Sequence, residues 1–297
     1  MSSRRLTLQR QPLESGGNRG GRSEPRTKSR SAMKELVVEA LRRAGLLKAG
    51  LRAHEGFRAL TSRGRRPRLT PDGLPLPSPR LMVMTAGTAD PDWFLESGRR
   101  SADSVRETLA HNGVQVETFR AMLDFGCGCG RVLRHWARLR NTEMHGSDYN
   151  LAPIRWCRRA LPFATFTNNG LRPPLPFPDG KFDFAYALSV FTHLPPELER
   201  TWMAELRRVV RPGGYLLITT HGEGFMALLT AAERDGFLAG RAVVRCSDVA
   251  GTNLCVAYHP AAYVRRQLVS EFEVVDEIPE GARGNPGQDV YLLRRAP

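Results

Sequence analysis

The chain has 297 residues, of which 41% are hydrophobic, and this is typical of a globular protein with one large domain or two small ones. Almost all of the net charge of +14 lies near the start. Residues 1–80 hold 19 Lys and Arg against 6 Asp and Glu, which leaves 25 against 24 in residues 81–297. The later part therefore has no charge excess that would attract a polyanion, and no segment reaches the roughly 18 consecutive apolar residues of a membrane-spanning helix.

The first 80 residues are predicted to form two regions outside the main domain. Residues 1–32 are rich in Arg, Ser and Gly and lack an apolar pattern, so we expect a disordered basic tail. Residues 33–80 are expected to hold an amphipathic helix over residues 33–51, followed by a linker with five prolines in residues 62–80. The main domain is expected to span residues 81–297.

Strand and helix signals alternate along this main domain. Asp90 followed by Pro91 indicates the start of a helix that runs to about Leu109. The strand-like runs that follow are residues 120–125, 143–148, 163–167, 182–188, 214–220, 271–278 and 289–295, and the helix-like segments are residues 131–140, 151–161 and 196–210. The alternation predicts an α/β fold of the doubly wound, Rossmann-like type, with a mostly parallel sheet of seven strands.

Three glycines, Gly126, Gly128 and Gly130, follow the first predicted strand. In a doubly wound sheet the ligand lies beyond the carboxyl ends of the strands, where glycine lets the backbone approach it. The spacing G-x-G-x-G differs from the G-x-G-x-x-G of a dinucleotide-binding turn, and the Gly-Lys-Ser/Thr of a phosphate-binding loop is absent. Asp124, two residues before Gly126, suits a ligand that carries positive charge.

A second acid, Asp148, stands at the end of the second predicted strand, 24 residues after Asp124. A carboxylate at this place accepts hydrogen bonds from the ribose hydroxyls of a nucleoside. The alternative that Asp148 only caps the helix starting near Asn150 stays open. A ligand with an ammonium group, a ribose and an adenine is S-adenosylmethionine, which we expect as the cofactor.

These motifs, together with two later segments, resemble the class I S-adenosylmethionine-dependent methyltransferase family, in particular its bacterial small-molecule and glycan type. The later segments are LPFPDGKFDFAYALSVFTHLPPE and LRRVVRPGGYLLITTHG. The strong motifs cover about residues 119–222. The resemblance implies that the protein is an enzyme that transfers the methyl group of S-adenosylmethionine.

The resemblance also implies cofactor contacts. They are Asp124, Gly126, Cys127, Gly128 and Gly130 at the methionine end, Asp148 at the ribose, Tyr149, Asn168 and Asn169 at the adenine, and Leu188 and Ser189 after the fourth strand. Amides stand at positions 168 and 169, where the family often has an acid that binds the adenine amine, so this contact departs from the family pattern.

Cysteine spacing argues against a metal site. The five cysteines are odd in number and contain no C-x-x-C pair, so we predict no metal. They are expected to be small packed side chains, and with no signal-like apolar run at the start the chain is expected in the cytoplasm.

The absence of certain motifs reduces the range of possible methyl acceptors. The Asn/Asp-Pro-Pro-aromatic motif of amino methyltransferases and the Pro-Cys of cytosine enzymes are absent, which leaves an oxygen or nitrogen of a small molecule or glycan. For the favoured O-methylation a histidine near neutral pKa is a suitable general base. The candidates are His193, His221 and His259.

The sequence is also compatible with other functions. The basic arm is compatible with a nucleic-acid- or ribosome-directed methyltransferase, which would bind with a steep salt dependence. A non-catalytic cofactor-binding protein and a dinucleotide-dependent oxidoreductase are further alternatives. Trp93 and Phe94 are expected either to close over the cofactor or to pack in the core, and the oligomeric state is left open.

Overall fold

The computed structural model describes residues 37–61 and 70–297. The basic tail predicted over residues 1–32 lies outside these residues. The chain divides into a first compact unit up to Gly50 and a second from Leu51 to Pro297. Helix is present over residues 37–43 and in α2 (Leu47–Thr61), and Gly45, with φ of 67°, separates the two, so the helix expected over residues 33–51 is interrupted.

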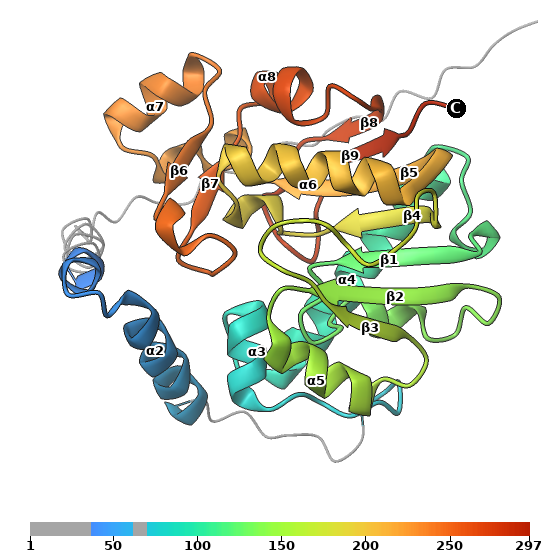
Figure 1. The fold of residues 1–297 in the computed structure, drawn as a ribbon, viewed down its shortest axis with the longest axis horizontal. Helices are drawn as coiled ribbons and strands as arrows, with labels where there is room; N and C mark the ends of the chain where they lie inside the picture. Colours follow the sequence, from blue (N-terminus) through green and yellow to red (C-terminus); the bar gives the residue numbers. More distant parts are fainter. Residues whose placement is uncertain (1–36, 62–69) are drawn as a thin grey trace, which may run out of the picture. The chain divides into compact units, whose positions relative to one another are not determined.

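The centre of the second unit is a sheet of seven strands (Figure 1). The strands are β1 (Ala121–Phe125), β2 (Glu143–Asp148), β3 (Thr165–Asn168), β4 (Phe182–Ala187), β5 (Val210–Thr220), β8 (Glu273–Ile278) and β9 (Asp289–Arg294). Their order is β3-β2-β1-β4-β5-β9-β8. Strands β1 to β5 pair in parallel, whereas β9 is antiparallel to both of its neighbours. The predicted mostly parallel, doubly wound α/β fold is confirmed.

Both faces of the sheet are covered, which explains why its central strands are continuously apolar. Successive side chains of a strand point to opposite faces, and Met122 and Leu123 accordingly belong to different core clusters. The helices of the second unit, beyond the end of α2, are α3 (Pro79–Ala86), α4 (Pro91–His111), α5 (Leu151–Ala160), α6 (Pro196–Val209), α7 (Ala231–Leu238) and α8 (Ala261–Tyr263). Helix α4 packs on the face of Met122, and α6 on the face of Leu123.

Helix α4 begins as its sequence predicts. The side chain of Asp90 accepts hydrogen bonds from the backbone N–H groups of Asp92 (3.0 Å) and Trp93 (3.4 Å), and Pro91 occupies the first helical position. The helix expected over residues 131–140 is instead a short 3₁₀ turn at Leu133–Trp136. Arg131 and Arg134 are both buried there, so tertiary contacts rather than helical propensity decide the local structure.

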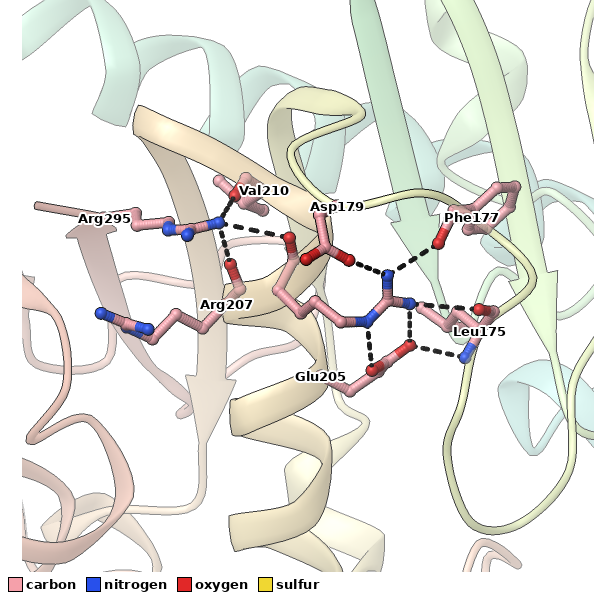
Figure 2. Close-up of polar contacts among 8 residues, drawn as sticks. Leu175, Phe177, Asp179, Glu205, Arg207, Val210 and Arg295 are labelled. Atoms are coloured by element: carbon pink, nitrogen blue, oxygen red, sulfur yellow. Dashed lines mark hydrogen bonds and ion pairs between the residues drawn. The ribbon is translucent and has the colours of Figure 1, made fainter. Parts of the chain in front are cut away.

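The base of the sheet is anchored to the end of α6 (Figure 2). Arg295 Nη1 donates to the carbonyl oxygens of Arg207 (2.8 Å) and Val210 (2.7 Å), which the end of a helix leaves without intrahelical partners. The carboxylate of Glu205 accepts the backbone N–H of Leu175 at 2.6 Å. These contacts tie the end of α6 to the segment after β9 and to the loop before β4.

A small module that the sequence did not predict follows β5. It consists of α7 and a two-stranded antiparallel sheet of β6 (Val243–Arg245) and β7 (Val256–Tyr258). Leu229, Phe237 and Tyr258 form its own apolar cluster. Strands of three residues are too short to show an alternating pattern in sequence. Within the described residues, no helix has the length and apolar character that crossing a membrane requires.

Candidate functional site

The turn after β1 has the backbone that its glycines permit. Gly126, Gly128 and Gly130 have φ of 80°, 51° and 65°, in the left-handed region that other residues rarely adopt. A Cβ atom on Gly126 would collide with Val190, and one on Gly128 with Thr85. The turn therefore needs glycine both for its conformation and for the close approach of neighbouring groups.

Asp124 lies on β1 directly before this turn and is almost fully buried. Its partner in the register with β4 is Tyr186, whose hydroxyl hydrogen-bonds to the carboxyl group. Burial raises the pKa of Asp124 to about 7, and neither Tyr186 nor the charge of Arg131 offsets this. The site thus contains a carboxyl group that a bound cation would help to ionise.

Asp148 ends β2 and faces the same turn. Its carboxylate accepts the backbone N–H groups of Gly128 (2.9 Å) and Asn150 (2.7 Å). The cap of α5 is Asn150, whose side chain accepts the N–H of Ala152 at 3.2 Å. Burial raises the pKa of Asp148 to about 6. Asp148 therefore hydrogen-bonds both to the glycine turn and to the residue that caps α5.

The residues predicted for the adenine lie beside Asp148. Asn168 donates from Nδ2 to the carbonyl oxygens of Asp148 (2.9 Å) and Tyr149 (3.0 Å). The Oδ1 atom of Asn169 accepts the hydroxyl of Ser147. The ring of Tyr149 is partly exposed and lies against Gly251. The two amides thus tie β3 to β2, and the ring remains available to a ligand.

Cys127 is packed inward, since its sulfur lies near Gly146 and the side chain is buried. Burial raises the pKa of its thiol well above the usual range. Only the backbone of Cys127 can therefore line a ligand at the turn. Among the described residues, no group of three or more His, Cys, Asp or Glu side chains could hold a metal ion.

The strand order of this sheet differs from that of a dinucleotide-binding sheet. A dinucleotide-binding sheet has the order 3-2-1-4-5-6, whereas here the antiparallel β9 occupies the position next to β5. Residues 123–218 match the family model described as methyltransferase domain. This part of the chain is therefore a methyltransferase domain.

Several curated methyltransferases are similar to this chain. A fatty-acid O-methyltransferase of Mycolicibacterium smegmatis is 36% identical over 126 residues, covering 42% of this chain and 44% of its own. A phthiotriol/phenolphthiotriol dimycocerosates methyltransferase of Mycobacterium ulcerans is 37% identical over 103 residues, covering 34% and 37%. The chain thus spans less than half the length of these relatives.

Solved structures with a similar fold include an S-adenosylmethionine-dependent methyltransferase of Mesorhizobium loti, with 19% identity and a TM-score of 0.49 over 65% of this chain and 100% of that chain. Another is a 1,6-didemethyltoxoflavin-N1-methyltransferase of Burkholderia thailandensis, with 18% identity and a TM-score of 0.48 over 70% and 82%.

At the end of β4 the methyltransferase domain holds Ser189 in a strained backbone conformation, with φ of 59°. Its N–H donates to Thr219 Oγ1 (2.7 Å), and its hydroxyl accepts from Gln288 Nε2 (2.9 Å). Thr219 in turn donates to Gln288 Oε1 at 2.8 Å. Leu188, beside Ser189, borders a small cavity shared with α4.

Gln288 is a site residue that sequence reasoning missed. It precedes β9, and the antiparallel direction of β9 brings its first residues to the carboxyl edge of the other strands. No motif in the sequence predicts that β9 runs antiparallel to β5. The strand direction, which only the pairing with β5 reveals, places Gln288 next to Ser189.

The three candidate histidines differ in the hydrogen bonds that their ring nitrogens make. His193 donates from Nδ1 to the carbonyl oxygen of Cys255 at 2.7 Å, which leaves Nε2 as the basic nitrogen, and burial lowers its pKa. His221 contacts the carbonyl of Ala257 through Nδ1 (3.1 Å) and Gln288 through Nε2 (3.3 Å). Burial and His193 lower the pKa of His221 to about 4.

His259 is fully buried behind this edge. Its Nε2 lies 2.7 Å from Glu199 Oε1, and the hydroxyl of Tyr263 donates to Glu199 Oε2 at 2.9 Å. No group in the described part of the chain hydrogen-bonds to its Nδ1. The buried Glu199 carboxylate thus joins α6 to the segment after β7.

Proposed function

We propose that the protein is a methyltransferase that moves a methyl group from S-adenosylmethionine to an oxygen of a small molecule. The observation that carries the proposal is the left-handed glycine turn between two buried carboxyl groups, Asp124 and Asp148, in a methyltransferase domain. Relatives named as fatty-acid, tocopherol and malonyl-[acyl-carrier protein] O-methyltransferases support an oxygen acceptor. A glycan hydroxyl is the alternative acceptor.

The residues present fit this cofactor. The left-handed glycine turn has a backbone that lets a ligand approach, Asp124 suits an ammonium group, and Asp148 suits two ribose hydroxyls. Tyr149 is placed to pack on the adenine, with Asn168 and Asn169 behind it, and Leu188 and Ser189 complete the site. When bound, S-adenosylmethionine supplies a methyl group on a sulfonium, and the protein contributes alignment and a base.

His193 is the histidine that best suits the role of base. Its Nδ1–H is held by the carbonyl of Cys255, so the neutral ring directs its lone pair from Nε2, and that atom has no protein partner among the described residues. The lowered pKa keeps the ring neutral at pH 7. The low pKa of His221 and the burial of His259 make them weaker candidates.

The compartment of the protein and the exclusion of a nucleic-acid acceptor are also part of the proposal. The five cysteines, all within the described residues, are free thiols, which supports a reducing compartment such as the cytoplasm. A nucleic-acid acceptor is disfavoured because residues 81–297 are nearly neutral.

The test is calorimetric titration of S-adenosylmethionine and S-adenosylhomocysteine into the wild type, Asp148→Ala, and the matched control Asp103→Ala, which removes an exposed carboxylate on α4. We expect micromolar binding that only Asp148→Ala weakens, by about tenfold or more, or about 1.4 kcal/mol. Wild-type protein that is folded and binds neither compound refutes the cofactor assignment. Incubation with fatty acids, phenols and sugars, read by mass spectrometry, then identifies the acceptor.

A further inference from the structure

Strand β7 holds two histidines through backbone carbonyl groups along one of its edges. Among the described strands it pairs only with β6, so its other edge is available to neighbouring groups. The carbonyl oxygen of Cys255, directly before the strand, lies 2.7 Å from His193 Nδ1. That of Ala257, within the strand, lies 3.1 Å from His221 Nδ1. A carbonyl oxygen only accepts, so in both rings Nδ1 carries the proton and Nε2 is the basic nitrogen.

Backbone groups of the same segment hold each histidine a second time. The N–H of Gly251 donates to the carbonyl oxygen of His193 at 2.8 Å. The N–H of His259 donates to the carbonyl oxygen of His221, also at 2.8 Å. Residues 251–259 therefore bind both the side chain and the backbone of each histidine, and a displacement of β7 would release both rings.

A buried polar cluster ties the end of β7 to α6. Glu199, in the first turn of α6, and His259, directly after β7, are both fully buried. The carboxylate of Glu199 accepts from His259 Nε2 at 2.7 Å through Oε1, and from the hydroxyl of Tyr263 at 2.9 Å through Oε2. Removal of one partner from such a cluster leaves a buried polar group unsatisfied, which is costly. The cluster therefore opposes any movement of β7 away from α6.

The cluster lies where it controls the contact between His193 and β7. His193 ends the 3₁₀ turn that leads into α6. Strand β7 lies beside this turn, near the start of α6 (Figure 1). Glu199 and His259 thus join the two elements whose adjoining residues, His193 and Cys255, form the hydrogen bond to Nδ1.

We propose that Glu199 and His259 are positioning residues for the general base His193, an inference that rests on the function proposed above. By holding β7 against α6 they keep the Cys255 carbonyl on His193 Nδ1. The lone pair of Nε2 then accepts the proton of the acceptor hydroxyl while its oxygen takes the methyl group. Without this pair, neutral His193 is expected to shift its proton to Nε2, the tautomer that histidine favours in water, and that atom is then unable to act as the base.

The experiment determines the tautomer of His193 by ¹⁵N NMR of the full chain with labelled imidazole nitrogens, and His193→Gln assigns the signal. Glu199→Ala removes the cluster, whereas the amide of Glu199→Gln still accepts from His259 and donates to Tyr263. The matched control is Glu197→Ala, which removes an exposed carboxylate from the same turn of α6. We expect the proton on Nδ1 of His193 in the wild type, in Glu199→Gln and in the control. Glu199→Ala should shift this proton to Nε2.

Two outcomes overturn the inference: a wild type whose His193 carries its proton on Nε2, or a folded Glu199→Ala variant whose His193 keeps the proton on Nδ1. Should Glu199→Ala fail to fold, Tyr263→Phe removes one of the two hydrogen bonds to Glu199 and should divide the proton of His193 between both nitrogens. An unchanged tautomer in that variant also overturns the inference. Calorimetric titration of S-adenosylmethionine into the wild type separates the two proposals, because absence of binding refutes the proposed function whatever the tautomer of His193.

Discussion

At the scale of single residues, the site places acids where water cannot stabilise their charge. Asp124 has a pKa of about 7 because burial disfavours the carboxylate, and Asp148 has a pKa of about 6 for the same reason. A ligand that brings positive charge restores the ionised form. We therefore expect binding of the cofactor at these acids to release a proton near neutral pH.

This coupling predicts the pH dependence of cofactor binding. Asp124 is mostly protonated at pH 6 and ionised at pH 8, and a cationic ligand prefers the ionised form. We therefore expect the affinity for S-adenosylmethionine to rise about tenfold between pH 6 and pH 8. Calorimetry at both pH values measures it, and Asp124→Asn, which cannot titrate, should bind weakly with little pH dependence. A wild-type affinity that stays flat between these pH values contradicts the role of Asp124.

The glycine turn offers a test with an internal control. Gly128→Ala imposes left-handed strain and drives a Cβ atom into Thr85, whereas Gly113→Ala imposes left-handed strain where no atom lies within 4 Å of the new Cβ. Both variants should lose about 1–2 kcal/mol of stability from the strain. Only Gly128→Ala should also weaken S-adenosylmethionine binding, by tenfold or more. Equal binding by the two variants in thermal-shift titrations would show that the turn does not hold the cofactor.

At the scale of elements, an ion pair between the buried Arg134 and the partly exposed Asp72 attaches the segment before α3 to the domain. Arg134, in the 3₁₀ turn after the glycines, binds Asp72 with two hydrogen bonds. The compact unit that begins at Leu51 includes both partners of this pair.

Removing one partner of this ion pair should be worse than removing both. Asp72→Ala leaves the Arg134 charge buried and unpaired, so we expect a loss of about 3–5 kcal/mol in the free energy of unfolding. The double variant Asp72→Ala with Arg134→Met should recover most of this loss. Chemical denaturation of the three proteins measures both values. A double variant no more stable than Asp72→Ala would mean that the hydrogen bonds, and not the unpaired charge, dominate.

At the scale of the whole molecule, the residues assigned to the cofactor all follow residue 90. We therefore expect a protein without residues 1–36 to bind S-adenosylmethionine with a Kd within twofold of the full chain. Calorimetry checks this. In the alternative of a nucleic-acid acceptor, the same deletion would abolish a salt-dependent affinity for RNA. A tenfold loss of cofactor affinity on deletion would instead assign the basic arm to the cofactor site.

The sequence by itself determined the parallel sheet, the start of α4, the glycine turn and the two acids. These features depend on local patterns, namely apolar periodicity, capping residues and glycine spacing, which act over a few neighbouring residues. Contacts between segments that are distant in the sequence cannot be predicted from such local patterns. Only the tertiary structure therefore decided the antiparallel place of β9, which brings Gln288 to Ser189, and the burial of Arg131 among Ser97, Ser101 and Asn285. Burial likewise decided the raised pKa values of the two acids, because desolvation depends on everything packed around a group.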